Sequence, residues 1–466
     1  MTELRLYNTL MREKRTFESI EPKRVRIYTC GPTVYSRSHL GNMRPYVFAD
    51  LLRRTLLSRG YEVRHVINVT DVGHLAGDTD DGEDKMELAA RTTGLSAWDI
   101  AEKWTAVFKA DLVKLNVLEP HVWCKATDHI PDQIALIQTL EEKGFTYRSA
   151  DTIYFDTSKD PNYGELARLN LDAQQTQERI EGAAHKRNPA DFALWKLTPG
   201  EVRRQMEWES PWGVGFPGWH LECSAMSSRY LGVPFDIHTG GIDHVPIHHT
   251  NEIAQSEAAF GVRPWVNTWM HNGWLMFESG KMAKSAGTTV TLEDIEADGI
   301  EPLSMRYLLL NAHYRQQMNY SGDAISGAQS AHRRLLRHVE EYARSDESEG
   351  AEHVEPYRRR FADAIADDLN SPQALAVVWE MVRATELGAV EKSGLLAEFD
   401  RVLALGLDGA KIEAPDLDED VKRLIAEREQ ARADRDFARA DEIRDELLAD
   451  GIVLEDNPSG TRWRRA

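Results

Sequence analysis

The stretch YTCGPTVYSRSHLGNMR, residues 28–44, holds the signals that decide the fold. It joins the end of a short β-branched segment, VRIYTC (Val25–Cys30), to a Gly-Pro turn and then to HLGN (His39–Asn42) at the start of a predicted helix. A helix N-terminus offers unsatisfied N–H groups and the positive end of the helix dipole, and Gly41 there lets a ligand approach the backbone closely. The pattern predicts a phosphate-binding turn, although an ordinary helix cap can have the same residues.

The neighbouring segments alternate between strand and helix signals. YVFADLLRRTLLSRG (residues 46–60) has helical periodicity and ends on Gly60, a residue typical of a helix C-terminus. YEVRHVINVT (Tyr61–Thr70) is a second β-branched segment, and FDIHTGG (Phe235–Gly241) is a further predicted strand. A strand, a helix and a strand in this order predict a βαβ unit and a parallel sheet.

The rest of the chain divides by composition. Residues 125–205 are more irregular and polar, which indicates an insertion within the α/β domain. After residue 316 the sequence becomes helical and rich in Ala, Glu and Arg, and it ends with IVLED-NPSG-TRWRR, a predicted hairpin. We predict a Rossmann-like α/β core (1–125 and 205–265), an insertion (126–204), a connector (266–335), an α-helical bundle (336–415) and a small α+β module (416–466).

The charge balance bounds the possible functions. Asp and Glu total 76 against 56 Lys and Arg, of which 16 are lysine, and the net charge is −20. An acidic surface poor in lysine suits a very salty cytoplasm, although an ordinary acidic cytosolic protein can have the same balance. The charge argues against broad, nonspecific binding of nucleic acid and leaves a local basic patch open.

Targeting and cysteine usage indicate the compartment. No apolar segment is long enough to span a membrane, and the N-terminus MTELRLYNTL has no signal-peptide pattern. Cys30, Cys124 and Cys223 lie too far apart for a zinc ribbon or a dense disulfide framework. We therefore expect a cytoplasmic protein with reduced thiols and no membrane partner.

A second segment carries possible metal ligands. In IHHTNEIAQSE (Ile247–Glu257), a predicted helix, His248 and Glu252 are spaced i, i+4 and share one face. The two could be a solvated or capping pair, because a metal site needs further ligands from elsewhere in the chain.

A third segment carries cations. SGKMAKSAG (Ser279–Gly287) sets Lys281 and Lys284 in a loop flanked by Gly and Ser. Mobile lysines suit the charge that develops on a departing pyrophosphate. Taken alone, the same segment could be a solvated loop.

In order and together, these segments resemble a known family. HLGN and KMAKS resemble the HIGH and KMSKS motifs of class I aminoacyl-tRNA synthetases, and HTGGIDH (His238–His244) resembles the turn that this class places at the ribose. Four longer segments look like cysteinyl-tRNA synthetase: TCGPTVY, SPWGVGFPGWHLECSAM, HHTNEIAQSE and DFARADEIRDELLADGIVLED. The resemblance runs from about Tyr7 to Arg465. It implies a Rossmann-like class I synthetase catalytic domain with an insertion, then an α-helical bundle and a small α+β anticodon module.

The resemblance implies a zinc ion that selects the amino acid. The family binds one zinc ion at the positions that match Cys30, Cys223, His248 and Glu252, a plausible set of zinc ligands. In the family this zinc also accepts the sulfur of the substrate, and zinc binds a thiolate far better than a serine hydroxyl. Pocket shape alone would separate serine from cysteine by only about 1–3 kcal/mol. We therefore expect no editing site, and Cys124 matches no ligand position.

The other site residues are also carried over by position. Thr70 and Trp219 match positions that line the cysteine pocket, although Trp219 could simply pack in the core. The resemblance assigns the contacts with Mg-ATP to Asp243 at the ribose, to His39, Gly41 and Asn42 at the phosphates, and to Lys281 and Lys284 in the transition state.

The terminal hairpin offers a stacking ring between cations. Arg462, Trp463 and Arg464 suit unstacked anticodon bases and their phosphates, although an edge strand can be basic by chance. The resemblance therefore places the tRNA anticodon at these residues.

The chain departs from the family pattern at several positions. Asn42 replaces the second histidine of HIGH, and Ala283 replaces the middle serine of KMSKS. Phe216 stands where the family usually has arginine, so any contact of that guanidinium is in doubt, and TDVGHL (Thr70–Leu75) differs from the family's TDIDDK. No departure removes a zinc ligand.

We predict an enzyme that activates L-cysteine with Mg-ATP and esterifies it to the terminal adenosine of tRNA(Cys), as a monomer. One alternative is the related cysteine ligase of mycothiol biosynthesis, which passes the same adenylate to an amino sugar but lacks the terminal module that this chain keeps. The other is a non-catalytic, zinc-containing RNA-binding module, against which His39, Lys281 and Lys284 count.

Overall fold

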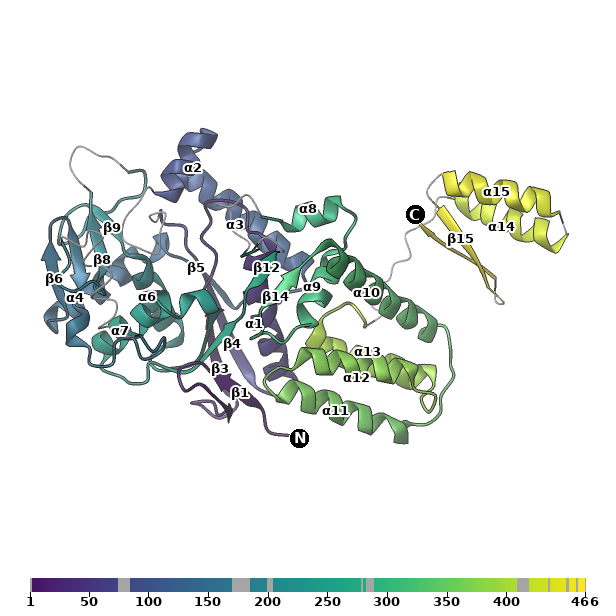
Figure 1. Cartoon of the computed structure of the whole chain (residues 1–466), viewed down its shortest axis with the longest axis horizontal. Coiled ribbons are helices and arrows are strands. Elements are labelled where there is room, and N and C mark those ends of the chain that lie inside the picture. The colour runs from purple at the N-terminus through teal and green to yellow at the C-terminus, as the bar shows by residue number, and fades with distance from the viewer. Residues whose placement is uncertain are drawn as a thin grey trace. The chain divides into compact units, whose positions relative to one another are not determined.

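The computed structural model describes residues 2–73, 84–169, 185–198, 204–277, 280–281, 289–408, 419–434, 436–449, 452–457 and 460–465 (Figure 1). The chain forms two compact units, Met1–Gly409 and Ala410–Ala466, and each is described by itself. Of the helices in the described part, none combines the length and the hydrophobicity needed to cross a membrane.

A five-stranded parallel sheet forms the centre of the first unit. The strands lie in the order β11-β10-β3-β4-β5. Their bounds are Arg24–Thr29 (β3), Glu62–Val69 (β4), Val122–Lys125 (β5), Phe235–Gly241 (β10) and Val266–Asn272 (β11). The three strands predicted at 25–30, 61–70 and 235–241 are confirmed. The strand order reverses between β3 and β10, and open parallel sheets bind ligands at the carboxyl ends of strands beside such a reversal.

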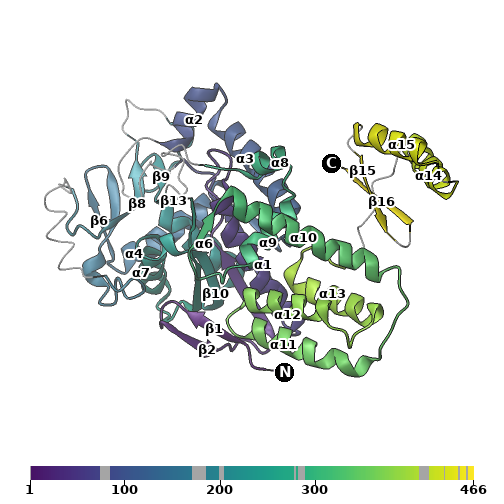
Figure 2. The same ribbon diagram turned by 45° about the vertical axis from the view of Figure 1, so that its right-hand side comes forward.

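Helices cover both faces of this sheet. Helix α1 lies on one face, and α6 and α7 lie on the other (Figures 1 and 2). Helix α1 begins at Leu40 and ends at Ser58; Arg59 caps it, and Gly60 follows with φ of 75°. The predicted helix end is therefore confirmed to within two residues. The helices around this sheet are α1 (Leu40–Ser58), α2 (Lys85–Thr93), α3 (Ala97–Lys114), α6 (Trp219–Leu231) and α7 (His248–Phe260), with the 3-10 turn η3 (Ile242–His244).

Three strands of a second, antiparallel sheet lie in the region predicted as an insertion, and the fourth strand lies beyond it. Its order is β6-β7-β8-β9, with bounds Thr146–Ser149, Thr152–Phe155, Phe192–Leu197 and Gly215–Pro217. Helix α4 (Ile130–Glu142) and the 3-10 turns η1 (Thr127–His129) and η2 (Thr157–Lys159) accompany it. The fourth strand, β9, follows residue 204 and leads directly into α6. The predicted division at 204 stays a prediction.

Smaller elements connect the sheet to a helical bundle. They are β1 (Arg5–Asn8), β2 (Glu13–Thr16), β12 (Leu275–Phe277), β13 (Gly280–Lys281), β14 (Met318–Tyr320), α8 (Leu292–Ala297) and α9 (Pro302–Leu310). The bundle consists of α10 (Gly322–Tyr342), η5 (Ala351–His353), α11 (Val354–Ala366), α12 (Ser371–Arg383) and α13 (Ala389–Leu403). Strand β12 pairs with β13 on one side and with β14 on the other.

Buried Arg306 of α9 ties these parts together. Its guanidinium pairs with Asp50 Oδ2 of α1 at 2.6 Å. It also donates to Leu115 O after α3 at 2.9 Å and to Leu403 O at the end of α13 at 2.7 Å. Losing one partner of such a pair leaves a buried charge, which costs about 3–5 kcal/mol. The helix that carries the HIGH-like motif is therefore fixed to the bundle.

The second unit is a helix pair with a hairpin. Helices α14 (Glu419–Ala433) and α15 (Phe437–Ala449) pack through a small cluster formed by Ile443, Leu447, Leu424 and Ile425. Strands β15 (Ile452–Asn457) and β16 (Gly460–Arg465) pair antiparallel, with Leu454 opposite Trp463. The predicted terminal hairpin is confirmed, and the domain boundaries predicted from the sequence stay predictions.

Side-chain bonds also cross the parallel sheet just below Cys30. His65 Nε2 on β4 lies 2.8 Å from Thr29 Oγ1 on β3, which lies 2.7 Å from Thr239 Oγ1 on β10. Burial, with a contribution from Arg53, lowers the pKa of His65 to about 3. His65 is therefore neutral in the native sheet at neutral pH and is protonated near pH 6.5 only when the chain unfolds.

This difference predicts how acid affects stability. The contribution of His65 is complete above pH 6.5 and is lost as the pH falls toward 3, because only the unfolded chain gains the proton. Urea denaturation measures the unfolding free energy at pH 6 and at pH 5. The decrease between these two pH values should be roughly 1 kcal/mol larger for the unmutated protein than for His65→Gln. An equal loss in both proteins would contradict this account.

Candidate metal centre and active site

The four predicted zinc ligands come together at the carboxyl end of the central strand. Cys30 directly follows β3, Cys223 lies on α6, and His248 and Glu252 lie one turn apart on α7. All four side chains are buried, and their ligand atoms lie within 4.8 Å of one another. The two sulfurs are 3.9 Å apart, and His248 Nε2 lies 3.0 Å from Glu252 Oε1. The alternative of a solvated His-Glu pair is therefore wrong.

Two further histidines reach the same cluster. His249 Nε2 lies 3.2 Å from Cys30 Sγ, and His238 Nε2 lies 3.0 Å from Glu252 Oε2. Cys30, His238, His249 and Glu252 form a second group within 4.8 Å, which shares two members with the first. The first group offers two thiols and the second only one, so the first suits zinc better.

The cluster is built to hold positive charge. Burial by itself would raise the pKa of Glu252, but His238 and His248 lower it to about 2. Burial by itself would lower the pKa of His248, but Glu252 and Cys223 raise it to about 10. In the metal-free cluster a proton on His248 therefore balances the Glu252 carboxylate. A divalent cation can take the place of that proton.

The same donors pass a simple test of fit for zinc. Burial raises the pKa of the Cys30 thiol well above its ordinary value, so a nearby cation is needed to hold it as a thiolate. Two thiols, an imidazole and a carboxylate, brought together from the end of β3, from α6 and from α7, meet the ligand preferences of zinc. Zinc is thus compatible with this site.

The predicted walls of the cysteine pocket lie beside the cluster. Thr70, at the end of β4, donates to Glu222 Oε2 at 3.1 Å and accepts from Asn68 Nδ2 at 3.1 Å. Asn68 Oδ1 in turn accepts from Gly31 N at 2.7 Å, next to Cys30. The Trp219 ring is half-buried, and its centroid lies 4.4 Å from that of His248. Trp219 therefore lies directly beside the ligand His248, and Thr70 is connected through Asn68 to Gly31, the neighbour of the ligand Cys30.

The HIGH-like motif forms the cap of α1. His39 is the N-cap residue; its Nδ1 accepts from Asn42 N at 3.3 Å, and its backbone N–H donates to Asn42 Oδ1 at 3.1 Å. A Cβ at Gly41 would lie 3.0 Å from the His39 ring, a tight contact that the ring would have to relieve by shifting. The helix cap and the predicted phosphate turn are thus the same structure. Asn42 completes this cap without a second imidazole.

The predicted ribose residue lies across the strand reversal from α1. Asp243 is exposed on η3, directly after β10, and its Oδ1 accepts from Trp274 Nε1 at 3.3 Å. Arg44 of α1 donates to Gly273 O at 2.8 Å and Trp274 O at 2.6 Å. The helix, the residue after β10 and the β11–β12 turn are therefore joined by side-chain bonds.

Both flanks of the lysine loop are attached near α1. Lys281 lies on β13, opposite Met276 of β12, and beyond the loop Leu40 N donates to Val290 O at 2.8 Å. His39 and Thr291 form a β-bridge. The Lys281 side chain lies outside the described residues, as do Ala283 and Lys284 altogether. Arg462, Trp463 and Arg464 lie on β16, and their side chains are likewise outside the described part.

Comparisons with known proteins decide the family. Residues 16–330 match the model of the class I (C) tRNA synthetase catalytic domain, residues 360–404 match a DALR domain, and residues 414–464 match the cysteinyl-tRNA ligase anticodon binding domain. The chain belongs to the cysteine–tRNA ligase family. Family members are class I aminoacyl-tRNA synthetases, and the resemblance inferred from the motifs is confirmed.

Full-length relatives support the same assignment. Cysteine–tRNA ligase 1 of Burkholderia lata is 49% identical over 98% of this chain and 96% of its own length. The cysteine–tRNA ligase of Treponema denticola is 42% identical over 99% of both chains. The predicted ligase activity class follows from these relatives.

Solved structures bear out the fold alone. A Mycobacterium tuberculosis methionyl-tRNA synthetase bound to methionyl-adenylate aligns with a TM-score of 0.57 and 16% identity, over 83% of this chain and 89% of that one. A LeuRS from Agrobacterium radiobacter aligns with a TM-score of 0.60 and 12% identity, over 84% and 85%. The predicted class I fold is confirmed.

Sequence reasoning missed the residues around the ligands. His238 was visible only as part of the ribose turn, and His271 of β11, which lies 2.7 Å from His249 Nδ1, had no signal at all. His249 did have a signal in the sequence, because it is spaced i, i+3 from Glu252 on the predicted helix that became α7. Asn68 and Glu222 were hidden because their partners lie far away in the sequence.

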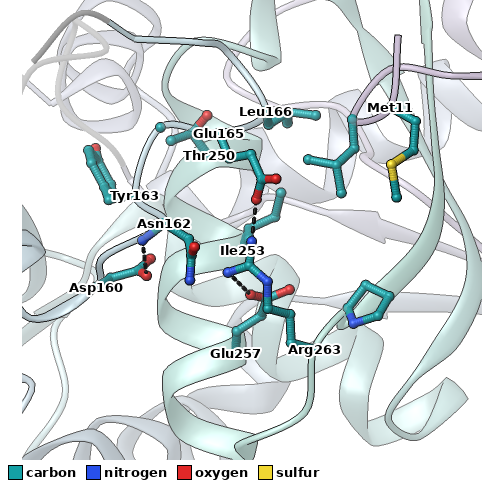
Figure 3. A pocket seen from close by; sticks show the side chains of 13 residues that line it. Met11, Asp160, Asn162, Tyr163, Glu165, Leu166, Thr250, Ile253, Glu257 and Arg263 are labelled. Atoms are coloured by element: carbon teal, nitrogen blue, oxygen red, sulfur yellow. Dashed lines mark hydrogen bonds and ion pairs between the residues drawn. The ribbon is translucent and has the colours of Figure 1, made fainter. Parts of the chain in front are cut away.

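A separate cavity of about 130 Å³ lies on another side of α7 (Figure 3). Its lining includes Thr250, Ile253 and Glu257 of α7, together with residues from the N-terminal segment and the insertion. Arg263 in its wall pairs with Glu257 and Glu165. The lining contains no predicted site residue, so the cavity is not part of the metal centre.

The metal centre predicts the zinc content of the purified chain. Full-length protein should hold about one zinc per chain by elemental analysis, because a closed set of thiol, imidazole and carboxylate ligands binds zinc tightly. Cys30→Ser and Glu252→Gln should lose most of it. Cys124→Ser is the matched control, since Cys124 is a buried free thiol outside both ligand groups. A zinc-free native protein, or equal loss in the control, would refute the assignment.

Proposed function

We propose that the chain activates L-cysteine with Mg-ATP to cysteinyl-adenylate and transfers cysteine to the 3′ end of tRNA(Cys) in the cytoplasm. The observation that carries the proposal is the buried cluster of Cys30, Cys223, His248 and Glu252 at the carboxyl end of β3. It lies where ligands bind in an open parallel sheet.

Zinc held by these four side chains would supply a soft Lewis acid that prefers a thiolate to a hydroxyl. Thr70 and Trp219 lie next to the cluster and would hold the amino acid between them. The buried Glu222, which accepts from Thr70, would fix the orientation of that hydroxyl. Selection between cysteine and serine would then depend little on pocket shape.

The ATP end uses other residues of the chain. The N-terminus of α1, with His39, Gly41 and Asn42, would hold the phosphates through N–H groups and the helix dipole. Asp243 would accept from the ribose, and Lys281 and Lys284 would stabilise the charge on the departing pyrophosphate. The attachment of both flanks of the lysine loop beside α1 supports this division of roles.

The second unit would bind the anticodon. Arg462, Trp463 and Arg464 share the second strand of its hairpin, and a ring between cations suits unstacked bases. The alternative of a ligase that acts on an amino sugar is not favoured, because residues 414–464 match an anticodon binding domain.

Exchange of one ligand tests amino-acid selection. ATP–pyrophosphate exchange gives the ratio of kcat/KM for cysteine over kcat/KM for serine. In Cys223→Ser this ratio should fall to at most about 10–200-fold, the discrimination that pocket shape alone provides. Circular dichroism melting would show whether the variant folds. Cys124→Ser should keep the native ratio, and a ratio retained in Cys223→Ser would refute zinc-based selection.

Removal of residues 410–466 tests the tRNA end. The first unit has its own core, so the truncated chain should form cysteinyl-adenylate at a rate within about twofold of the full chain. Charging of tRNA(Cys) should fall by more than about tenfold, because stacking on a single base contributes about 1–3 kcal/mol. Unchanged charging would contradict the anticodon role.

A further inference from the structure

Arg204 makes contacts with two segments that lead to the predicted pocket walls. Its guanidinium carbon lies 3.5 Å from the centroid of the Phe216 ring. The same guanidinium donates to Gly73 O at 2.8 Å and pairs with the Asp84 carboxylate. The Arg204 and Asp84 side chains are only 10% and 9% exposed, so solvent screens this pair weakly.

These contacts join the two segments that carry the predicted pocket walls. Gly73 follows Thr70 by three residues in the segment that leaves β4. Phe216 lies in β9 and precedes Trp219 by three residues at the start of α6. Arg204 therefore touches the Thr70 side through a carbonyl and the Trp219 side through a ring.

Each wall segment also approaches a neighbour closely next to the bridge. A Cβ at Gly73 would overlap the Asp84 carboxylate, and a Cβ at Gly218 would overlap Ala193 O of β8. Asp84 also caps α2 by accepting from Met86 N at 2.7 Å. Replacement of Arg204 would therefore alter the distance between the two wall segments.

Phe216 supplies the aromatic side of the Arg204 bridge. Phe216 replaces an arginine of the family pattern, and the structure places the guanidinium of Arg204 against the phenylalanine ring. A flat cation stacked on a ring face is attracted by the quadrupole of the ring, most strongly where both are desolvated. Phe216 is 6% exposed, which meets that condition.

We propose that Arg204 is a positioning residue that sets the distance between the Thr70 and Trp219 walls and so limits the length of the thiol side chain admitted. This proposal rests on the proposed function. Metal ligation separates a thiol from a hydroxyl, but it does not measure how long the side chain is. The length of the side chain is limited by the two walls. The walls are joined by the Thr70–Glu222 hydrogen bond and, on the other side, by the contacts of Arg204 with Gly73 and Phe216.

Two competing substrates separate these two kinds of selection. Serine has the size of cysteine but lacks the thiol, whereas homocysteine keeps the thiol and adds one methylene. A pocket of fixed width rejects one methylene by about 10–200-fold. The test compares kcat/KM for cysteine, serine and homocysteine, measured by ATP–pyrophosphate exchange with the full-length, zinc-loaded enzyme.

Arg204→Leu should reduce the preference for cysteine over homocysteine to below about tenfold, with the preference over serine unchanged. Arg204→Lys, which keeps the charge but not the flat fork, should give an intermediate value. Phe216→Leu removes the ring and serves as a second variant in case Arg204→Leu does not fold. The preference of Phe216→Leu for cysteine over homocysteine should also fall.

The control is Arg315→Leu, at a more exposed arginine with the same kinds of partner. Arg315 also stacks on a ring, that of Tyr7 at 4.3 Å, and pairs with a buried aspartate, Asp368, at 2.8 Å, but it contacts neither wall segment. Its cysteine–homocysteine ratio should match that of the native enzyme. A native ratio in folded Arg204→Leu and Phe216→Leu overturns the proposal, and so does a parallel loss of serine rejection. Failure of the native enzyme to activate cysteine would instead refute the proposed function.

Discussion

A buried carboxylate that must face positive charge is the constraint on which the candidate metal centre depends. Glu252 has no access to water and lies 3.0 Å from both His238 and His248. Burial raises the pKa of the Cys30 thiol beside it, so that group becomes an anion only near a cation. Such a cluster is costly unless it is neutralised, by a proton in the metal-free protein or by a divalent ion. The family assignment and the ligand chemistry both favour zinc as that ion.

The parallel sheet makes this cluster possible. Cys30, Thr70 and Asp243 follow three adjacent strands at their carboxyl ends, where the strand order reverses. Side-chain bonds from His65 through Thr29 to Thr239 fix the register of the strands just below. Helix α1 starts at the same edge, so the proposed phosphate site and the metal centre share one rigid support. The lysine loop is attached to that support at both flanks.

The motifs predicted the parts of the site that are close in sequence, and distance in sequence explains what they missed. His248 and Glu252 were found because helical spacing places them on one face, and Phe235–Gly241 was found because its composition is typical of a strand. The four ligands could be joined only through the family resemblance, since no local pattern connects Cys30 with Cys223. Tertiary contacts such as Arg204 with Phe216 leave no trace in any single segment. Strand β9, with only three residues, likewise lacked the length that a periodic pattern needs.

X-ray absorption at the zinc edge of the full-length enzyme, with and without substrate, tests the central claim most directly. The account predicts two sulfur and two nitrogen or oxygen ligands in the free enzyme. It also predicts a third sulfur when cysteine is added and no change when serine is added. Fewer than two sulfurs in the free enzyme, or a sulfur number that cysteine leaves unchanged, would contradict the claim that this enzyme selects its amino acid through metal coordination.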